Sequence, residues 1–364
     1  MKLRKKATQI TMALLMVSAM MVNVTACQSK GKEAESSGNA AASSYITESG
    51  MPAENPNLND GVNRVGIAYS NLAAEATQVL IANYEEHYKE YGIDELIILQ
   101  AENNLQTQIE QVMDLVNQKC DMIIVNAVDS DGLAEVCDQV MAKGIPVMAV
   151  DRPVYTDLYY TCMSNNYEIG RDVARAFCMM SYKEGMADGS VKVLKCINGT
   201  TSAAVRDRLQ GVADELELWS HIKVVGEPSI EFDIEKTYNA IIDAFTADPD
   251  IDVVYVSGGN YVAPVVSALD ELGLLKPYGE EGHVIIASID GTATELNGIL
   301  AGENDISGVQ RFDLFGSKIL EACQNYFNGV YVDSYNDEDL EPGIITTPWN
   351  IENLKAKNML WGIH

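Results

Sequence analysis

The stretch MIIVNAVDSDGLAEVCDQVMAKGIPVMAVDR, residues 122–152, holds the pattern that decides the fold. It begins with a short apolar run at 122–125, continues through a segment with helical periodicity, and ends in a second apolar run at 146–150. Short, continuous runs rich in Val and Ile are typical of strands that are buried on both faces. The stretch therefore predicts a strand–helix–strand unit whose two strands are parallel.

The same alternation extends in both directions along the chain. Before residue 122 we expect a strand at 65–69, a helix at 73–91, a strand at 96–99 and a helix at 104–118. After Asn166 the pattern restarts, with strands expected at 191–196, 222–225, 253–256 and 284–287, helices between them, and a late helix at about 314–327. The chain is thus predicted to be an α/β protein with two successive halves, each built on a doubly wound parallel sheet.

The first 26 residues are typical of a secretory signal peptide. A basic start (Lys2, Arg4, Lys5, Lys6) precedes an apolar stretch from Ile10 to Val24, and small residues follow. A single transmembrane anchor is the alternative. It needs about 20 apolar residues, and polar residues interrupt this stretch.

The sequence Val-Thr-Ala-Cys at 24–27 resembles the bacterial lipobox. The resemblance implies that Cys27 is diacylated and that the mature protein is tethered to the membrane, because more than one acyl chain is needed for stable anchoring. Residues 27–60 are rich in Ser, Gly, Ala, Glu and Asn, which predicts a flexible linker. The remaining residues, 61–364, are long for one domain and normal for two.

The charge of the chain excludes one large class of partner. The formal net charge is −28, and it becomes −32 when the four cations of the signal peptide are removed. Nucleic-acid binding needs a basic footprint, so no nucleic acid is expected as a partner. The acidic balance also argues against electrostatic adhesion to anionic lipid.

The sequence shows little sign of catalysis, cofactors or metals. Four dispersed histidines and the lack of a nucleophile-elbow motif predict that the chain is not an enzyme and carries no cofactor. Beyond Cys27 there are six cysteines without metal-ligand spacing, which we expect to be reduced core residues: Cys120, Cys137, Cys162, Cys178, Cys196 and Cys323. The acidic stretch 333–343 leaves two alternatives open, a Ca²⁺ site at Asp333, Asp337 and Asp339 or a solvated loop.

A distinctive polar set follows the predicted strands. In open parallel sheets, ligands lie beyond the carboxyl ends of the strands. The polar residues at these ends are Ser70, Asn71, Asn126, Asp151, Arg152, Asp290 and Gln310, and Arg208 stands on the helix after Gly199. Carboxylates, amides and a guanidinium bind adjacent hydroxyl groups well, so the set predicts a site for a neutral polyol.

Three motifs resemble the type I periplasmic sugar-binding family, most closely its ribose-binding branch. They are IPVMAVDR at 145–152, TSAAVRDR at 201–208 followed by Gly211, and SIDGT at 288–292. The resemblance runs from about residue 63 to 354 and implies two lobes that close on a sugar or polyol, as a monomer that delivers it to an ABC transporter permease. A ligand-sensing protein that presents a sugar-like signal to a membrane receptor or kinase is the alternative.

The resemblance also implies lobe boundaries and residue roles. Three crossings near 164–165, 310 and 346–347 would divide the chain into lobes 61–164 plus 311–346 and 165–310 plus 347–364. Hydroxyl-binding roles are implied for Asn126, Asp151, Arg152, Arg208, Asp290 and Gln310. Phe232 matches an aromatic that lies against the sugar, with a plain core residue as the alternative.

Three departures from the family pattern put ribose itself in doubt, and one of them is Arg311, which follows Gln310 where a neutral residue is common. The aromatic segment that often follows the first strand is replaced by Ala73–Thr77, which would let Glu75 face the cleft. The Asn-Asp pair expected after the fifth strand reads Ser-Gly-Gly-Asn at 257–260, so Asn260 would substitute only if the loop shifts, and Tyr261 could supply a ring. A larger, modified or partly charged polyol is therefore compatible with the sequence.

Overall fold

The computed structural model describes residues 54–58, 60–330 and 338–363. The expected signal peptide, Cys27 and most of the linker 27–60 lie outside these residues. The described residues belong to one compact unit. Among them, no helix combines the length and apolar character that a membrane span requires.

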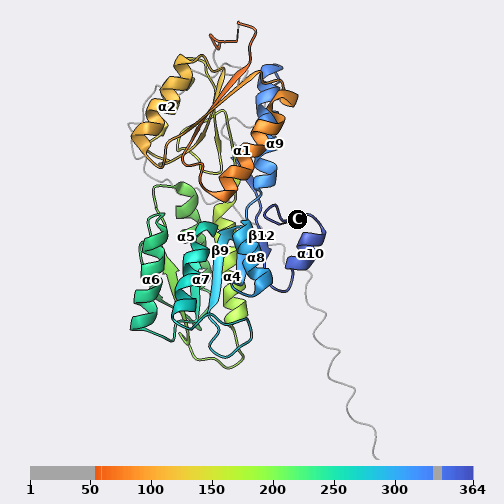
Figure 1. The fold of residues 1–364 in the computed structure, drawn as a ribbon. Helices are drawn as coiled ribbons and strands as arrows, with labels where there is room; N and C mark the ends of the chain where they lie inside the picture. The colour runs from red at the N-terminus through yellow and green to blue at the C-terminus, as the bar shows by residue number, and fades with distance from the viewer. Residues whose placement is uncertain (1–53, 59, 331–337, 364) are drawn as a thin grey trace, which may run out of the picture. The chain divides into compact units, whose positions relative to one another are not determined.

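The first sheet has six strands, all parallel, in the order β2-β1-β3-β4-β5-β11. Its strands are β1 (Arg64–Tyr69), β2 (Glu95–Gln100), β3 (Met122–Asn126), β4 (Val147–Val150), β5 (Tyr160–Ser164) and β11 (Glu338–Glu341). Its helices are α1 (Glu75–His87), the 3-10 turn η1 (Tyr88–Tyr91), α2 (Leu105–Asn117), α3 (Ala134–Met141) and α9 (Phe312–Phe327). Helices α1 and α9 cover one face of this sheet and α2 covers the other (Figure 1).

The second sheet repeats the same order, β7-β6-β8-β9-β10, and adds β12 antiparallel to β10. Its strands are β6 (Val191–Cys196), β7 (Ile222–Gly226), β8 (Val253–Val256), β9 (Ile285–Asp290), β10 (Ile306–Val309) and β12 (Ile344–Thr346). The helices that follow its chain are α4 (Asn166–Ser181), α5 (Ala203–Leu216), α6 (Ile234–Ala247), the 3-10 turn η2 (Gly259–Tyr261), α7 (Val262–Glu271), α8 (Ala293–Ala301) and α10 (Ile351–Ala356). The expected fold class, two doubly wound parallel-sheet lobes, is confirmed.

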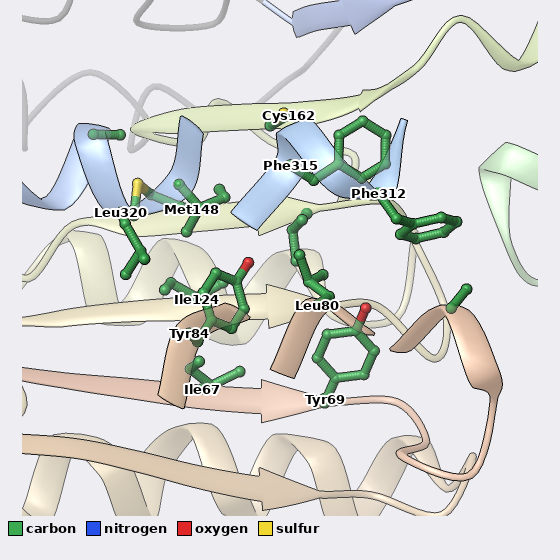
Figure 2. Close-up of a cluster of buried hydrophobic side chains, with 14 of the residues drawn as sticks. Ile67, Tyr69, Leu80, Tyr84, Ile124, Met148, Cys162, Phe312, Phe315 and Leu320 are labelled. Carbon is green, nitrogen blue, oxygen red and sulfur yellow. The ribbon is translucent and has the colours of Figure 1, made fainter. Parts of the chain in front are cut away.

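Each sheet is buried on both faces, which is why its strands read as continuous apolar runs. In β1, Ile67 belongs to the cluster under α1 and α9, whereas its neighbour Ala68 belongs to the cluster on the opposite face. Figure 2 shows the first cluster, in which Leu80 and Tyr84 of α1 and Phe315 of α9 meet the strands. Burying one such large apolar side chain contributes about 1.5–3 kcal/mol, so the layers hold the strand ends in place.

The chain passes between the two sheets three times. It leaves the first sheet after Ser164 and returns after Val309, near the expected crossings. The third crossing lies earlier than expected, because residues 344–346, placed by the resemblance in the first lobe, pair with β10 of the second sheet. Pro342-Gly343 separates the two strands here, and a Cβ on Gly343 would lie 2.4 Å from Ile169 Cγ1, so the close approach requires glycine.

Candidate functional site

Two adjoining cavities lie where the carboxyl ends of the strands of both sheets meet. The inner cavity has a volume of about 70 Å³ and the outer cavity about 400 Å³. Both are lined by Asp151, Arg152, Phe232, Asn260 and Tyr261. The inner one adds Arg208, Asp290 and Gln310, and the outer one adds Ser70, Asn71 and Asn126. The structure therefore brings all ten ligand-binding candidates of the sequence to this pair of cavities.

Asp290 ends β9 and is the most connected acid of the inner cavity. Its Oδ1 accepts a hydrogen bond from Gln310 Nε2 at 2.7 Å and lies 3.3 Å from Arg208 Nη1. Its Oδ2 accepts from the backbone N–H of Gly259 at 2.9 Å. Its φ of 146° is rare for a non-glycine residue, and such strain persists only where the surroundings hold it.

Glu295 supplies that support from the first turn of α8. Its carboxylate accepts from the backbone N–H groups of Gly291 and Thr292 at 2.8 and 2.7 Å, and from the hydroxyls of Ser288 and Ser307 at 2.5 and 2.8 Å. Thr292 and Glu295 form a capping box at the start of this helix. The turn that carries Asp290 is thus fixed by a second, fully buried carboxyl group.

Burial and the nearby charge of Asp290 raise the pKa of Glu295 to about 7. A Cβ at position 259 would lie 2.1 Å from Glu295 Oε2. This contact explains why Gly259 stands in the loop after β8, where Ser-Gly-Gly-Asn replaces the expected Asn-Asp pair. The carboxyl group of Glu295 takes up the space beside Gly259.

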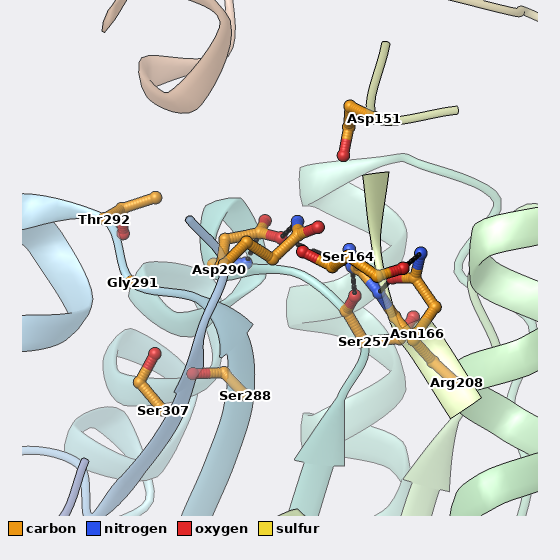
Figure 3. A network of polar contacts seen from close by, with 12 residues as sticks. Asp151, Ser164, Asn166, Arg208, Ser257, Ser288, Asp290, Gly291, Thr292 and Ser307 are labelled. Carbon is orange, nitrogen blue, oxygen red and sulfur yellow. Dashed lines mark hydrogen bonds and ion pairs between the residues drawn. The ribbon is translucent and has the colours of Figure 1, made fainter. Parts of the chain in front are cut away.

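Arg208 is held by three polar contacts, and only 5% of its surface is exposed. Besides Asp290, its Nε donates to Asn166 Oδ1 at 2.8 Å and its Nη1 donates to the carbonyl of Ser257 at 2.7 Å (Figure 3). Helix α4 can approach α5 closely because Gly170 has no side chain. A Cβ at this position would lie 2.3 Å from the carbonyl oxygen of Arg208. The guanidinium is therefore pre-oriented toward the cavity.

Asp151 approaches the same cavity from the first sheet, directly after β4. Its φ is 64°, and its Oδ2 accepts from Asn126 Nδ2 at 3.1 Å. Ser70 Oγ in turn donates to Asn126 Oδ1 at 2.5 Å. Burial raises the pKa of Asp151, while the nearby Arg152 opposes the rise. Figure 3 shows its carboxylate pointing toward the Asp290–Arg208 network.

Arg152 of the first lobe contacts Phe232 of the second lobe at the cavities. The Arg152 guanidinium lies 5.2 Å from the centre of the Phe232 ring, within cation–π range. Phe232 has a φ of 62°, and its N–H donates to Asn198 Oδ1 at 2.8 Å. A Cβ on Gly199 would lie 2.0 Å from the ring, so glycine there lets the ring lie flat against the backbone.

Other candidates have divided roles. Gln310 donates to Asp290, and its backbone carbonyl accepts from Trp361 Nε1 at 2.8 Å. Asn71 lines the outer cavity, but its Oδ1 accepts from the N–H of Ala73 at 2.7 Å. Asn260 and Tyr261 both belong to the 3-10 turn η2 and line both cavities.

Side chains of the first lobe also cap helices of the second. Glu75 Oε1 accepts from the N–H of Ala293, the first residue of α8, at 2.6 Å. Ser130 Oγ accepts from the N–H of Ala203, the first residue of α5, at 3.0 Å. Glu75, expected to face the cleft, thus contacts the second lobe and lines neither cavity. Arg206 of the second lobe pairs with Asp131 of the first at 3.2 Å.

Three residues that line the inner cavity each carry a buried polar atom with no hydrogen-bond partner among the described residues. The atoms are Ser202 Oγ, Ser257 Oγ and Gln310 Oε1. Buried polar groups are almost always paired, so these atoms indicate where a ligand with hydroxyl groups would bind. The arrangement offers carboxylates, amides, hydroxyls and a guanidinium for recognition.

In the part of the chain that the structure describes, no group of three His, Cys, Asp or Glu side chains is placed to hold a metal ion. Asp333 and Asp337 of the alternative Ca²⁺ site lie outside the described residues. Asp339 accepts from Tyr160 Oη at 2.9 Å and from Lys318 Nζ at 2.7 Å. The six cysteines of the described region are buried and unpaired, as expected of core residues.

Sequence reasoning missed the residues that support the site. Asn166, Asn198, Ser257 and Glu295 orient the expected residues, and Gln108 Nε2 donates to the carbonyls of Ala68 and Asn126 beneath the outer cavity. A signal was present for Glu295 alone, because Thr292 and Glu295 have capping-box spacing. The others are single polar residues next to apolar runs and carry no pattern.

Known proteins share this architecture. Residues 65–329 match the family model described as periplasmic binding protein domain. The ribose import binding protein of Bacillus subtilis (strain 168) is 24% identical over 268 residues, covering 73% of this chain and 82% of that protein. The xylitol-binding protein of Mycolicibacterium smegmatis is 26% identical over 251 residues, which cover 67% of this chain and 66% of that protein. A solute-binding protein from Bacillus halodurans, solved with bound myo-inositol, superposes with a TM-score of 0.73 at 21% identity, covering 82% of this chain and 99% of that one.

Proposed function

Because the chain belongs to the periplasmic binding protein domain family, we propose that it is an extracytoplasmic, lipid-anchored solute-binding protein. It captures a sugar or related polyol by closure of its two lobes and delivers it to an ABC importer. The lipid anchor is Cys27, and the partner in the membrane is the permease of that importer. The chain works without catalysis or a cofactor.

The observation that carries the proposal is the set of unpartnered polar atoms in the inner cavity. Ser202, Ser257 and Gln310, which carry these atoms, line the inner cavity together with the Arg208–Asp290 pair, and Asp151 lines it from the other lobe. A hydroxyl group both donates and accepts, so a polyol can satisfy these atoms together. A site of this kind rejects analogues that lack a hydroxyl, because its own groups would be left unpaired.

Closure follows from the placement of these groups on both lobes. Asp151 and Arg152 follow a strand of the first sheet, whereas Asp290 and Arg208 belong to the second lobe. A ligand shifts an open–closed equilibrium only through its preference for one state, and contacts from both lobes provide that preference.

A thermal-shift panel of pentoses, hexoses, inositols and other polyols tests the proposal. A ligand present at 100 times its Kd adds about 2.7 kcal/mol of stability, which raises the melting temperature measurably. At least one sugar or polyol should do so, and the shift should be lost in Arg208→Ala. Amino acids and peptides that stabilise the protein in place of every sugar would contradict the proposal.

A further inference from the structure

Helix α5 begins at the inner cavity. Ala204 and Val205 of its first turn line this cavity, and Arg208 lines it one turn later. Ala204 and Val205 stand four and three residues before Arg208, and side chains at these spacings share one face of a helix. The face of α5 that carries Arg208 therefore also brings the first turn of the helix to the cavity.

Two backbone donors of this first turn are left free. The first four N–H groups of an α-helix have no partner within the helix. The N–H of Ala203 donates to Ser130 Oγ at 3.0 Å, but those of Ala204 and Val205 have no acceptor among the described residues. Both residues are buried, and buried N–H groups are rarely left unpaired.

Ser202 stands at the N-cap of α5 but does not cap it. A serine in this position usually accepts from the N–H two or three residues further on, here that of Ala204 or Val205. No such bond is present, and the buried Ser202 Oγ has no partner among the described residues. Ser202 lines the inner cavity as well. The end of the helix thus offers three donors, two N–H groups and one hydroxyl.

The charges of the inner cavity indicate what kind of acceptor fits these donors. A helix N-terminus favours negative charge, but the carboxylates of Asp151 and Asp290 line the same cavity and would repel an anion. The guanidinium groups of Arg152 and Arg208 balance these two carboxylates, so no excess positive charge is left for an ionic ligand. The acceptor that fits is a neutral oxygen.

We propose that the first turn of α5 is itself a binding element, which holds one neutral oxygen of the sugar or polyol. The donors are the N–H groups of Ala204 and Val205 and the hydroxyl of Ser202. A hydroxyl or a ring oxygen can fill this position, because the group only has to accept hydrogen bonds. The inference rests on the proposed function and adds a backbone subsite to it.

Isothermal titration calorimetry on the full mature chain tests the role of the hydroxyl, with ribose, allose, arabinose, myo-inositol and xylitol as the panel. Ser202→Ala should weaken the tightest-binding member about five- to tenfold, the effect of one lost hydrogen bond. The melting temperature without ligand should not fall, because Ser202 Oγ caps no N–H of the protein. Ser220→Ala, exposed in the same lobe, is the matched control and should change neither value.

A backbone variant tests the N–H groups directly. Incorporation of lactate in place of Ala204 turns the amide into an ester, which removes the N–H and keeps the methyl side chain. The same ligand should bind about five- to tenfold more weakly. The same exchange at Ala213, whose N–H lies inside α5, should lower the melting temperature and leave the affinity unchanged.

The two failures can be told apart. If the wild type binds a member of the panel and the Ser202 and Ala204 variants bind it equally well, the inference is overturned and sugar binding stands. If the wild type binds no member of the panel, the proposed function fails together with the inference.

Discussion

Asp290 is a single residue whose carboxylate contacts three separate segments of the chain. One carboxylate oxygen meets Gln310 and Arg208, and the other accepts the N–H of Gly259. The first of these partners follows β10, the second belongs to α5 and the third to the turn after β8. A carboxylate that joins these three segments couples ligand contact at one of them to the other two.

Replacement of Asp290 by Asn should weaken ligand binding by about 10- to 100-fold. Hydrogen bonds to charged groups contribute about 1.5–3 kcal/mol, and 1.4 kcal/mol corresponds to a factor of ten. Calorimetric titration with the ligand found by the thermal-shift panel measures the change. Asp270→Asn removes an exposed carboxylate of the same lobe and should bind like the wild type. Equal affinity of the Asp290 variant would remove Asp290 from the binding site.

Glu295 links the pH to the stability of the second lobe. Its pKa is raised from 4.5 to about 7 by burial and by the charge of Asp290. Between pH 4.5 and about pH 7, the native protein therefore keeps a proton on Glu295 that the unfolded chain has lost. Since stability falls with rising pH wherever the native state binds more protons, this contribution is complete below pH 4.5 and lost above pH 7.

Glu295→Gln should remove this pH dependence. Denaturant unfolding of both proteins at several pH values gives the difference in their free energies of unfolding. Relative to the variant, the wild type should lose on the order of 1–3 kcal/mol between pH 4.5 and 7. Glu303→Gln, at an exposed position, is the control that should show no such loss. A constant difference between the Glu295 variant and the wild type would contradict the account.

The elements of the fold could be predicted where their pattern was strong. The eight expected strands all occur, because continuous apolar runs mark strands buried on both faces. Strand β5 was missed because its sequence, YTCMS, mixes polar residues into a run of five. Strand β11 lies within the acidic stretch 333–343 and β12 follows it; both are short, so tertiary pairing determines them and local sequence does not.

The site could be predicted to the level of its strand ends and no further. Strand order places those ends together, so ten candidates could be chosen from position alone. The division into two cavities could not be predicted, because it depends on how Phe232 projects from a turn and how Asn260 and Tyr261 project from η2. Nor could the partners of Glu75, since its contact at α8 joins residues 218 positions apart.

Helix α8 is capped by a carboxylate from the other lobe. An anion at a helix N-terminus contributes about 0.3–1 kcal/mol, so the contact between Glu75 and Ala293 favours the closed arrangement. Glu75→Ala should therefore lower ligand affinity by about two- to fivefold without touching the cavity lining. Titration calorimetry measures this change, and Glu85→Ala, at an exposed position of α1, provides the comparison. An unchanged affinity would show that the contact plays no part in closure.

For the whole molecule, the thiol count tests the proposed anchor. The chain has seven cysteines, and the six beyond Cys27 are buried and unpaired. Burial raises the pKa of Cys120, Cys162 and Cys196 to about 12, so these thiols should react slowly in the native protein. The wild-type protein, purified from the membrane fraction of the cells that express it and unfolded in denaturant, should show six free thiols, because acylation blocks Cys27.

A Cys27→Ser variant is the control for this count, since it should show six thiols whether or not lipidation occurs. Seven thiols in the membrane-derived wild-type protein would contradict acylation of Cys27. Fewer than six would contradict the unpaired state of the buried cysteines.

The central claim is that both lobes together bind one small polyhydroxylated ligand. Native mass spectrometry of freshly purified protein tests it most directly, because it detects a ligand that co-purifies without any prior guess of its identity. The account predicts a bound species with the mass of a neutral sugar, polyol or glycoside on the wild-type protein, and its loss from Asp290→Asn. A wild-type protein that carries a non-hydroxylated ligand, or a variant that retains the same bound species in full, would contradict it.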